Sequence, residues 1–311
     1  MKPDILSIAP IRPDQQRMLE ERFTVHRLYE AADPGALLGT CGERIRGVST
    51  TGFVGCGRDL MEQLPNLEIV ACMAVGVDAV DVAYAKSRGI HVTNTPDVLN
   101  DCVADLTLGL LIASARRLVV ADRFVRTGEW RKAPMPLATS LGAKRLGIVG
   151  LGRIGLAVAR RAEPFGLTVA YHNRRQRTDV PYRYYDNLTE LARNSDFLAI
   201  ITPGGPETRR LIDRAVLDAL GPQGTLINVA RGSVVDEPAL VAALQEGRLG
   251  AAALDVFEDE PQVPEALLAM DNVVLAPHVG SATVETRAAM AQLVVDNLIA
   301  HFDGRPLPTP V

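Results

Sequence analysis

The sequence has little of what marks a secreted, metal-binding or membrane protein. Its cysteines are few and widely separated, and they form neither a CxxC redox motif nor a paired zinc spacing: Cys41, Cys56, Cys72 and Cys102. The longest apolar run, Leu106 to Ala115, is only about half the length of a membrane span. The first residues place Asp4 before a very short apolar run, so no secretion signal is expected. We therefore predict a cytoplasmic protein with no transmembrane helix and no metal site.

Neither sign of charge is in large excess. The 33 basic and 37 acidic residues are interspersed and leave a formal net charge of -4, with a sequence pI of about 5.8. A protein without a basic surface has no long-range field that attracts nucleic acid or anionic membranes. The composition therefore argues against a nucleic-acid partner, and a small anion has to be bound by a local site.

The sequence does have the length and the apolar content for two hydrophobic cores. Its 311 residues exceed what one core usually organises, and 47% of them are hydrophobic. Short apolar runs alternate with helix-patterned stretches from end to end, which is typical of parallel sheets covered by helices on both faces. The predicted fold class is α/β, with two doubly wound parallel-sheet domains.

Two series of predicted strands define the two sheets. The first comprises Asp4 to Ala9, Thr24 to Leu28, Gly47 to Thr50, Ile69 to Met73 and His91 to Thr93. The second begins at Leu146 and continues with Thr168 to Tyr171, Phe197 to Ile201, Thr225 to Val229, Ala252 to Val256 and Val273 to Leu275. Helix periodicity fills Asp101 to Arg126, and Val284 to Phe302 has the pattern of an amphipathic helix. Periodicity alone does not decide which domain this last helix packs on.

A glycine-rich motif follows the apolar run that begins at Leu146 and opens a helix-patterned stretch that continues to Phe165. It reads Gly150, Leu151, Gly152, Arg153, Ile154 and Gly155. The first glycine permits the tight turn, the second lets the backbone approach a pyrophosphate, and the third lets the helix pack closely on the strand. The amides at the positive end of the helix are then available to phosphates. The motif predicts a dinucleotide-binding site.

The residues after the second strand of this domain indicate which dinucleotide is bound. NAD sites usually have an acid here, which binds the ribose 2′-hydroxyl. This sequence has Asn173 instead, followed by Arg174 and Arg175. A carboxylate would repel a 2′-phosphate, whereas a guanidinium binds one through two hydrogen bonds. The predicted cofactor is NADP, as NADPH, with Arg174 as the first candidate for the phosphate and NAD as the weaker alternative.

Three ionisable residues follow strands of the second series: Arg231, Glu260 and His278. The carboxyl ends of parallel strands meet at one edge of the sheet, where such folds bind ligands. A guanidinium, a carboxylate and an imidazole gathered there can bind an anionic ligand and transfer a proton to it. The sequence therefore predicts a catalytic site at this edge.

The order and spacing of these segments, with the glycine motif upstream, resemble the D-isomer-specific 2-hydroxyacid dehydrogenases. The resemblance runs from Val75-Gly76-Val77-Asp78 through the arginine, glutamate and histidine segments, and thus covers nearly the whole chain. It implies that Arg231 binds the substrate carboxylate and polarises the carbonyl. It also implies that His278 is the acid in reduction and the base in oxidation, and that Glu260 orients and tunes His278.

The resemblance implies further contacts. Val75 and Gly76 would present backbone amides to the substrate carboxylate, and Asp255 would contact the nicotinamide amide. The bend Thr202-Pro203 would lie against the adenosine half of the cofactor, and Thr107 behind the nicotinamide. Val229, Ala230 and Gly280, beside the catalytic residues, complete the expected cofactor contacts.

The same resemblance implies a division of labour between the domains. Residues 1–99 and 285–311 would form a flavodoxin-like substrate-binding domain, and residues 100–284 a Rossmann dinucleotide-binding domain. In the family a residue of a neighbouring subunit often closes the pocket, so a homodimer is expected, with Trp130 or Met135 at the interface. The alternative for Trp130 is a place in the core.

Substrate identity stays open at this stage. The likeness is greatest to glyoxylate and hydroxypyruvate reductases, which act on small 2-oxoacids, and next to hydroxyphenylpyruvate reductases. A different class is a dinucleotide-sensing scaffold, because the family includes transcriptional corepressors. The lack of long disordered tails favours the enzyme.

Overall fold

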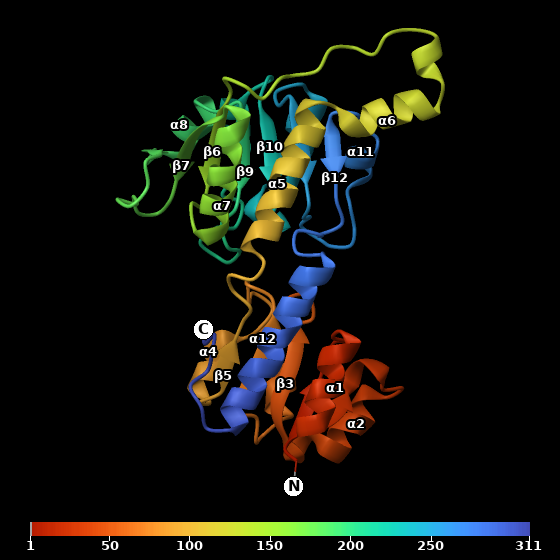
Figure 1. Cartoon of the computed structure of the whole chain (residues 1–311), viewed down its shortest axis with the longest axis vertical. Coiled ribbons are helices and arrows are strands. Elements are labelled where there is room, and N and C mark those ends of the chain that lie inside the picture. The colour runs from red at the N-terminus through yellow and green to blue at the C-terminus, as the bar shows by residue number, and fades with distance from the viewer. Residues whose placement is uncertain (1) are drawn as a thin grey trace. The chain divides into compact units, whose positions relative to one another are not determined.

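The computed structural model describes residues 2–311 and separates them into two compact units (Figure 1). One unit contains the chain up to Leu99 together with Thr283–Val311, and the other contains Asn100–Ala282. The chain thus returns to the first unit at Thr283, slightly before the expected residue 285. Each unit is built around one parallel sheet.

The first unit has a five-stranded sheet in the order β2-β1-β3-β4-β5, which is the flavodoxin-like order. Its strands are β1 (Asp4–Ser7), β2 (Thr24–Arg27), β3 (Ile45–Thr51), β4 (Ile69–Met73) and β5 (His91–Thr93). Its helices are α1 (Pro13–Arg22), α2 (Pro34–Cys41), α3 (Arg58–Glu62), α4 (Val82–Ser87) and α12 (Val284–Phe302).

Helix α12 belongs to the core of this first unit. Its residues Val294 and Leu298 are buried in a cluster with Ile5 of β1 and Leu19 of α1. Thr283 begins the helix by accepting the backbone N–H of Thr286 on its side-chain oxygen. A segment distant in sequence therefore completes the layer that covers one face of the first sheet.

The second unit has a seven-stranded parallel sheet in the order β12-β11-β10-β9-β6-β7-β8. Read from β8, this is the Rossmann strand order with one further strand, and the winding direction reverses between β6 and β9. Its strands are β6 (Arg145–Val149), β7 (Thr168–His172), β8 (Arg183–Tyr184), β9 (Phe197–Ile200), β10 (Thr225–Asn228), β11 (Ala251–Leu254) and β12 (Val273–Leu275). The predicted class, α/β with two doubly wound parallel sheets, is confirmed.

Helices cover both faces of this second sheet. They are α5 (Asn100–Ala115), α6 (Leu118–Arg126), α7 (Arg153–Ala162), α8 (Leu188–Arg193), α9 (Arg214–Leu220), α10 (Glu237–Gln245) and α11 (Glu265–Leu268). Neighbouring residues of β9 point to opposite faces, because Leu198 packs with Leu217 of α9 while Phe197 packs with Val158 of α7. Among residues 2–311, no helix combines the length and apolar character that crossing a membrane requires.

Two local predictions were wrong, and one strand was not predicted. The helix expected from Asp101 to Arg126 is interrupted, because Arg117 adopts a left-handed backbone with φ 52° between α5 and α6. Strand β8, only two residues long, had no recognisable pattern. The helix expected to continue to Phe165 ends at Ala162, and Phe165 lies in a short 3-10 turn after α7, where it is 45% exposed.

Candidate active site

All the residues predicted to bind the dinucleotide or to catalyse lie in the second unit, most of them at the carboxyl edge of its sheet. Gly150 follows β6, Asn173 follows β7, and Thr202 follows β9. Arg231, Asp255 and His278 come after β10, β11 and β12 in the same way. Because the sheet is parallel throughout, these strand ends share one edge. The topology thus brings segments from across the unit to one edge.

The glycine motif has the geometry of a phosphate cradle. Gly150 has φ 100°, and a Cβ there would lie 2.8 Å from the Ile201 carbonyl carbon. A Cβ on Gly155 would lie 2.4 Å from the Gly150 carbonyl oxygen, so both positions require glycine. A Cβ on Gly152 would meet nothing within 4 Å, and no side chain caps the start of α7. Open space therefore faces the uncapped amides of a helix N-terminus, which fits a pyrophosphate.

Asn173 holds the turn of this motif. Its Oδ1 accepts the backbone N–H of Leu151 at 2.6 Å. The backbone N–H of Gly150 donates to the His172 carbonyl at 3.0 Å, so β7 and the residue after it both bind the glycine motif. Asn173 thus has a structural contact with the cradle in addition to its predicted place near the ribose.

The three arginines after β7 differ in their contacts. Arg174 is 83% exposed and forms an ion pair with Glu207, and Arg175 is exposed. Arg177 binds Asp179 with Nε at 2.9 Å and donates from Nη1 to the Leu151 carbonyl at 3.0 Å. Arg177 therefore supports the glycine motif from behind, whereas Arg174 lies at the surface.

Arg231 is carried by a rigid loop after β10. Asn228 accepts the N–H of Ala230 at 3.0 Å and donates to the Arg231 carbonyl at 3.0 Å, which closes a tight turn. The guanidinium Nη1 donates to the Ala230 carbonyl at 2.7 Å. A Cβ on Gly232 would lie only 1.9 Å from the carbonyl carbon of Phe257, so this loop rests directly on the one that follows β11.

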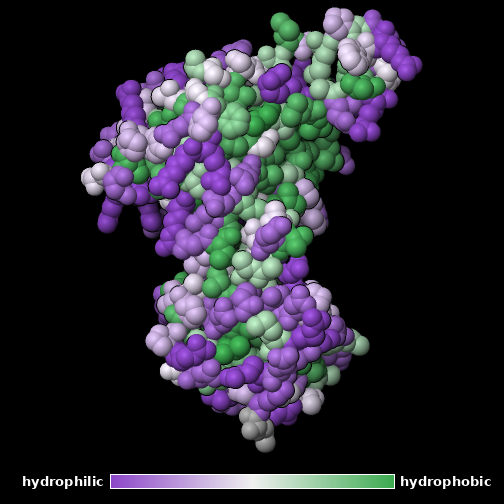
Figure 2. Space-filling view, in the orientation of Figure 1, coloured by the Kyte–Doolittle hydropathy of each residue, from purple (hydrophilic) through white to green (hydrophobic). Residues whose placement is uncertain are grey.

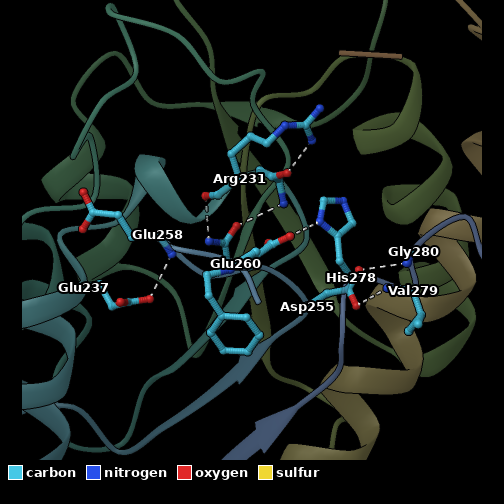
Figure 3. Close-up of polar contacts among 11 residues, drawn as sticks. Arg231, Glu237, Asp255, Glu258, Glu260, His278, Val279 and Gly280 are labelled. Atoms are coloured by element: carbon cyan, nitrogen blue, oxygen red, sulfur yellow. Dashed lines mark hydrogen bonds and ion pairs between the residues drawn. The ribbon is translucent and has the colours of Figure 1, made fainter. Parts of the chain in front are cut away.

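Glu260 and His278 form a hydrogen-bonded pair (Figure 3). His278 Nδ1 lies 2.7 Å from Glu260 Oε2, and the Phe257 N–H donates to Glu260 Oε1 at 3.0 Å. Burial would raise the pKa of Glu260, but these two hydrogen bonds and the positive charges of His278 and Arg231 outweigh it, and the pKa falls below its usual value. Glu260 is therefore ionised at neutral pH and can accept a hydrogen bond from His278 Nδ1.

Asp255 fixes the backbone on which His278 sits. Its two carboxylate oxygens accept the N–H groups of Val279 at 2.7 Å and Gly280 at 2.8 Å, and its carbonyl accepts the His278 N–H at 2.8 Å. These bonds hold His278 in a left-handed conformation with φ 52°. Asp255 is 1% exposed, and burial raises its pKa despite the two amide bonds that lower it. The structure thus gives Asp255 a positioning contact, in addition to its predicted contact with the cofactor.

The remaining predicted cofactor contacts are placed as follows. Thr107 is fully buried in α5, and its hydroxyl donates to the Val103 carbonyl at 2.7 Å. Pro203 is exposed after β9, and its carbonyl accepts from the Thr208 hydroxyl at 2.8 Å. Val229 and Ala230 lie within the Arg231 turn, and a Cβ on Gly280 would lie 3.2 Å from Asp255 Oδ2.

Val75 and Gly76 belong to the first unit, after β4. The Asn94 side chain donates to the Val75 carbonyl at 2.9 Å, and Val75 is 36% exposed. A Cβ on Gly52 would lie 2.7 Å from the Ala74 Cβ, so the loop after β3 packs against this one. Both loops lie at the carboxyl edge of the first sheet.

The residues that hold the loops of the site in place were not predicted from the sequence. Asn228 and Arg177 had no predicted catalytic or cofactor contact, and the bonds by which they support the site run to backbone atoms. An asparagine at the end of a buried strand is a known signal for a side-chain turn, so Asn228 was open to prediction. The contact of Arg177 depends on tertiary structure and had no signal.

The fold and this site are those of a dinucleotide-binding oxidoreductase. A family model described as the NAD-binding domain of D-isomer-specific 2-hydroxyacid dehydrogenases matches residues 108–280. The chain belongs to this family.

Similar proteins include enzymes named for two substrate types. Glyoxylate/hydroxypyruvate reductase A of Arabidopsis thaliana is 50% identical over 307 residues, covering 99% of this chain and 98% of that protein. Hydroxyphenylpyruvate reductase of Plectranthus scutellarioides has the same identity and coverage. The crystal structure of an NADPH-dependent glyoxylate/hydroxypyruvate reductase from Sinorhizobium meliloti, with NADP and malonate, matches with a TM-score of 0.95. It is 48% identical, and the match covers 100% of this chain and 97% of that one.

Proposed function

We propose that the protein uses NADPH to reduce a small 2-oxoacid, glyoxylate or hydroxypyruvate, to the D-2-hydroxyacid. The observation that carries the proposal is the His278–Glu260 pair, which lies at the same sheet edge as the glycine motif and Arg231. The names of relatives similar over their whole length support the substrate class.

The proposed chemistry divides among three side chains. The planar guanidinium of Arg231 binds the substrate carboxylate and withdraws electron density from the carbonyl. Glu260 engages His278 Nδ1, so the proton for the carbonyl oxygen is delivered from Nε2. As the proton leaves, the ionised Glu260 keeps the ring in the orientation that accepts it back in the oxidative direction. Asp255 holds the loop of His278, and Asn228 holds the loop of Arg231. These contacts fix the position of each side chain relative to the substrate.

The dinucleotide is proposed to be NADP, with NAD as a weaker alternative. Bound NADPH supplies the hydride. The amides of the glycine motif would hold its pyrophosphate, and Arg174, helped by Arg175 and Asn173, its 2′-phosphate. The S. meliloti reductase, which is described as NADPH-dependent and was solved with NADP, supports this choice.

Two alternatives to this substrate and function are considered. A hydroxyphenylpyruvate reductase is favoured by a relative of that name at the same 50% identity. We assign the substrate-binding role to the first unit, where Phe53 and Val54 are exposed beside the Val75–Gly76 loop and offer apolar surface to an aromatic side chain. A dinucleotide-sensing scaffold has no specific observation in its favour.

We also propose that the protein is a homodimer built on the segment from Leu118 to Thr139. In Figure 1 this segment extends away from the second sheet, and Figure 2 shows hydrophobic side chains at the surface over α5 and beside α6. Exposed apolar side chains of the segment are Leu118, Val119, Val125, Trp130 and Leu137. Trp130 is 67% exposed in the single chain, so it is not a core residue there. Apolar surface of this extent is typical of an interface. The cytoplasmic location stays a prediction.

Initial rates with five oxoacids and both reduced cofactors test the proposal. The acids are glyoxylate, hydroxypyruvate, pyruvate, phenylpyruvate and hydroxyphenylpyruvate. Faster oxidation of NADPH than of NADH with glyoxylate or hydroxypyruvate is expected. Faster turnover of the aromatic acids would indicate a hydroxyphenylpyruvate reductase. Dinucleotide binding without turnover of any acid would indicate a dinucleotide-sensing scaffold.

A further inference from the structure

Glu237 is a half-buried carboxylate in the first turn of α10, outside the residues given a role above. Its Oε2 accepts the backbone N–H of Glu258 at 3.1 Å (Figure 3). Burial raises the pKa of Glu237, and the carboxylates of Glu258 and Asp259 add to the rise, while the Glu258 N–H opposes it. A carboxylate in such surroundings is costly unless it is hydrogen-bonded. The Glu258 amide is therefore its stabilising partner.

That amide belongs to the loop that carries Glu260. The preceding amide, of Phe257, donates to Glu260 Oε1 at 3.0 Å, and Glu260 Oε2 binds His278. Two successive backbone N–H groups therefore donate to two carboxylates: that of Phe257 to Glu260, and that of Glu258 to Glu237. The Phe257 N–H belongs to the preceding peptide unit, so the peptide bound by Glu237 is joined through the Phe257 Cα to the peptide that binds Glu260.

The same loop is held from two other directions. The Glu258 side chain pairs with Arg209 at 3.3 Å and with Arg210 at 3.7 Å. On its other side, the Phe257 carbonyl lies against Gly232, where an added Cβ would approach it to 1.9 Å. Gly232 follows Arg231 directly, and the same connection continues into α10 and Glu237. Glu237 therefore ties the segment that carries Arg231 to the loop that carries Glu260.

We propose that Glu237 is a positioning residue for the Arg231, Glu260 and His278 site, acting by fixing the peptide that connects Phe257 to Glu258. The inference rests on the proposed function of that site, because the three side chains must keep fixed distances for proton transfer. It predicts that the acceptor atom of Glu237 matters more than its negative charge. An amide in its place can still accept the Glu258 N–H, whereas a methyl group cannot.

Substitutions of Glu237 in the full chain test this role. Glu237→Ala is expected to lower kcat about 10-fold or more, because small displacements of catalytic groups have large effects. The KM for NADPH should stay unchanged, since the glycine motif is not involved. Glu237→Gln should retain most of the wild-type kcat. Glu246→Ala is the matched control, since Glu246 ends the same helix and pairs with Arg248. If the alanine variant does not fold, Glu237→Asp, which withdraws the acceptor by one methylene, takes its place.

Two readouts separate positioning from a purely structural effect. The pH profile of kcat should change shape in Glu237→Ala, because the Glu260–His278 bond is loosened, and the NMR signal of the His278 ring should shift. Unchanged kcat, pH profile and ring signal in this variant would overturn the inference, as would equal losses in the alanine and glutamine variants. The NMR test needs no turnover, so it holds even if the wild-type protein reduces no oxoacid, which would remove the proposed function instead.

Discussion

His278 and Glu260 are joined by a 2.7 Å hydrogen bond although they lie in loops that follow different strands, β12 and β11. The bond uses Nδ1, and the backbone of the histidine is fixed independently by Asp255. The ring orientation is therefore set from two sides, which is the condition for a directed proton transfer.

Replacement of the histidine tests its role directly. His278→Ala should reduce kcat by about 100-fold or more, which is the usual contribution of a general acid. Dinucleotide affinity, measured by fluorescence titration, should stay near the wild-type value because the glycine motif is untouched. His91→Gln, at an exposed position of the first sheet, is the matched control. Near-normal turnover of His278→Ala would exclude the residue from the mechanism.

Glu260→Gln should change the pH dependence of reduction. The wild-type carboxylate has a lowered pKa, so it is ionised across the neutral range and binds the ring of His278. Protonation of this carboxylate at acid pH should weaken that hydrogen bond and lower kcat/KM. Glutamine does not titrate, so the decline of kcat/KM on the acid side should be lost in Glu260→Gln. Glu265→Gln, at an exposed site in α11, should leave the profile in place; a decline that persists in Glu260→Gln would contradict this role of the carboxylate.

Arg174 and Glu207 should have opposite effects on NADPH binding. Arg174→Ala removes the proposed phosphate ligand and should weaken NADPH binding about 10-fold, with NADH binding little changed. Glu207→Gln removes a carboxylate that occupies Arg174 and repels a phosphate, so NADPH binding should become a few-fold tighter. Isothermal titration with both cofactors measures the two effects. Arg193→Ala breaks a comparable exposed pair with Glu190 and serves as the control. Equal weakening of both cofactors in Arg174→Ala would place the phosphate elsewhere.

Substitutions of two glycines of the motif should have different effects on protein stability and on dinucleotide binding. Gly155→Ala places a Cβ 2.4 Å from the Gly150 oxygen and should lower the melting temperature. Gly152→Ala meets open space and should leave the melting temperature of the free protein unchanged, yet weaken dinucleotide binding. Thermal melts with and without NADPH distinguish the variants. Unaltered affinity in Gly152→Ala would mean that the pyrophosphate does not approach this glycine.

Asp196 should stabilise the fold in a pH-dependent way. Burial raises the pKa of Asp196, whereas the Arg145 N–H at 2.8 Å, the Arg145 guanidinium and Lys144 lower it. The lowering effects are the larger, so the pKa lies below its usual value. A lowered carboxyl pKa gives stability that is present above the unfolded-state pKa and is lost as the pH falls through the folded-state value. Asp196→Asn should therefore cost about 1 kcal/mol at pH 7 and progressively less below pH about 4. Urea unfolding at both pH values measures the difference, and a cost that does not depend on pH would count against the ion pair.

Much of the fold was predictable because each strand is short, apolar and bounded by turn residues. The glycine motif, with a strand before it and a helix after it, identified β6 and α7. The failures have local causes: at Arg117 the backbone turns left-handed without a glycine to signal it, and β8 has only two residues. The place of α12 depended on which sheet offered a complementary surface, which periodicity does not encode.

The catalytic side chains of the site were predictable from the sequence, but the residues that hold them in position were not. Arg231, Glu260 and His278 follow strand ends, so parallel topology alone gathers their segments at one edge. The supporting contacts all join a side chain to a backbone amide or carbonyl. They are those of Asp255 with Val279 and Gly280, of Arg177 with Leu151, and of Glu237 with Glu258. Every residue has such backbone groups, so the sequence offers no partner-specific signal for them.

The bond from Leu151 to the Asn173 oxygen bears on how cofactor preference changes during evolution. Because only the acceptor end of the amide holds the glycine turn, an aspartate at this position would keep that bond with one carboxylate oxygen and present the other to a ribose hydroxyl. Exchange of the amide nitrogen for an oxygen would therefore add a negative charge beside the ribose and leave the bond that holds the glycine turn in place. Cofactor preference and the stability of the turn can thus be changed separately at this position.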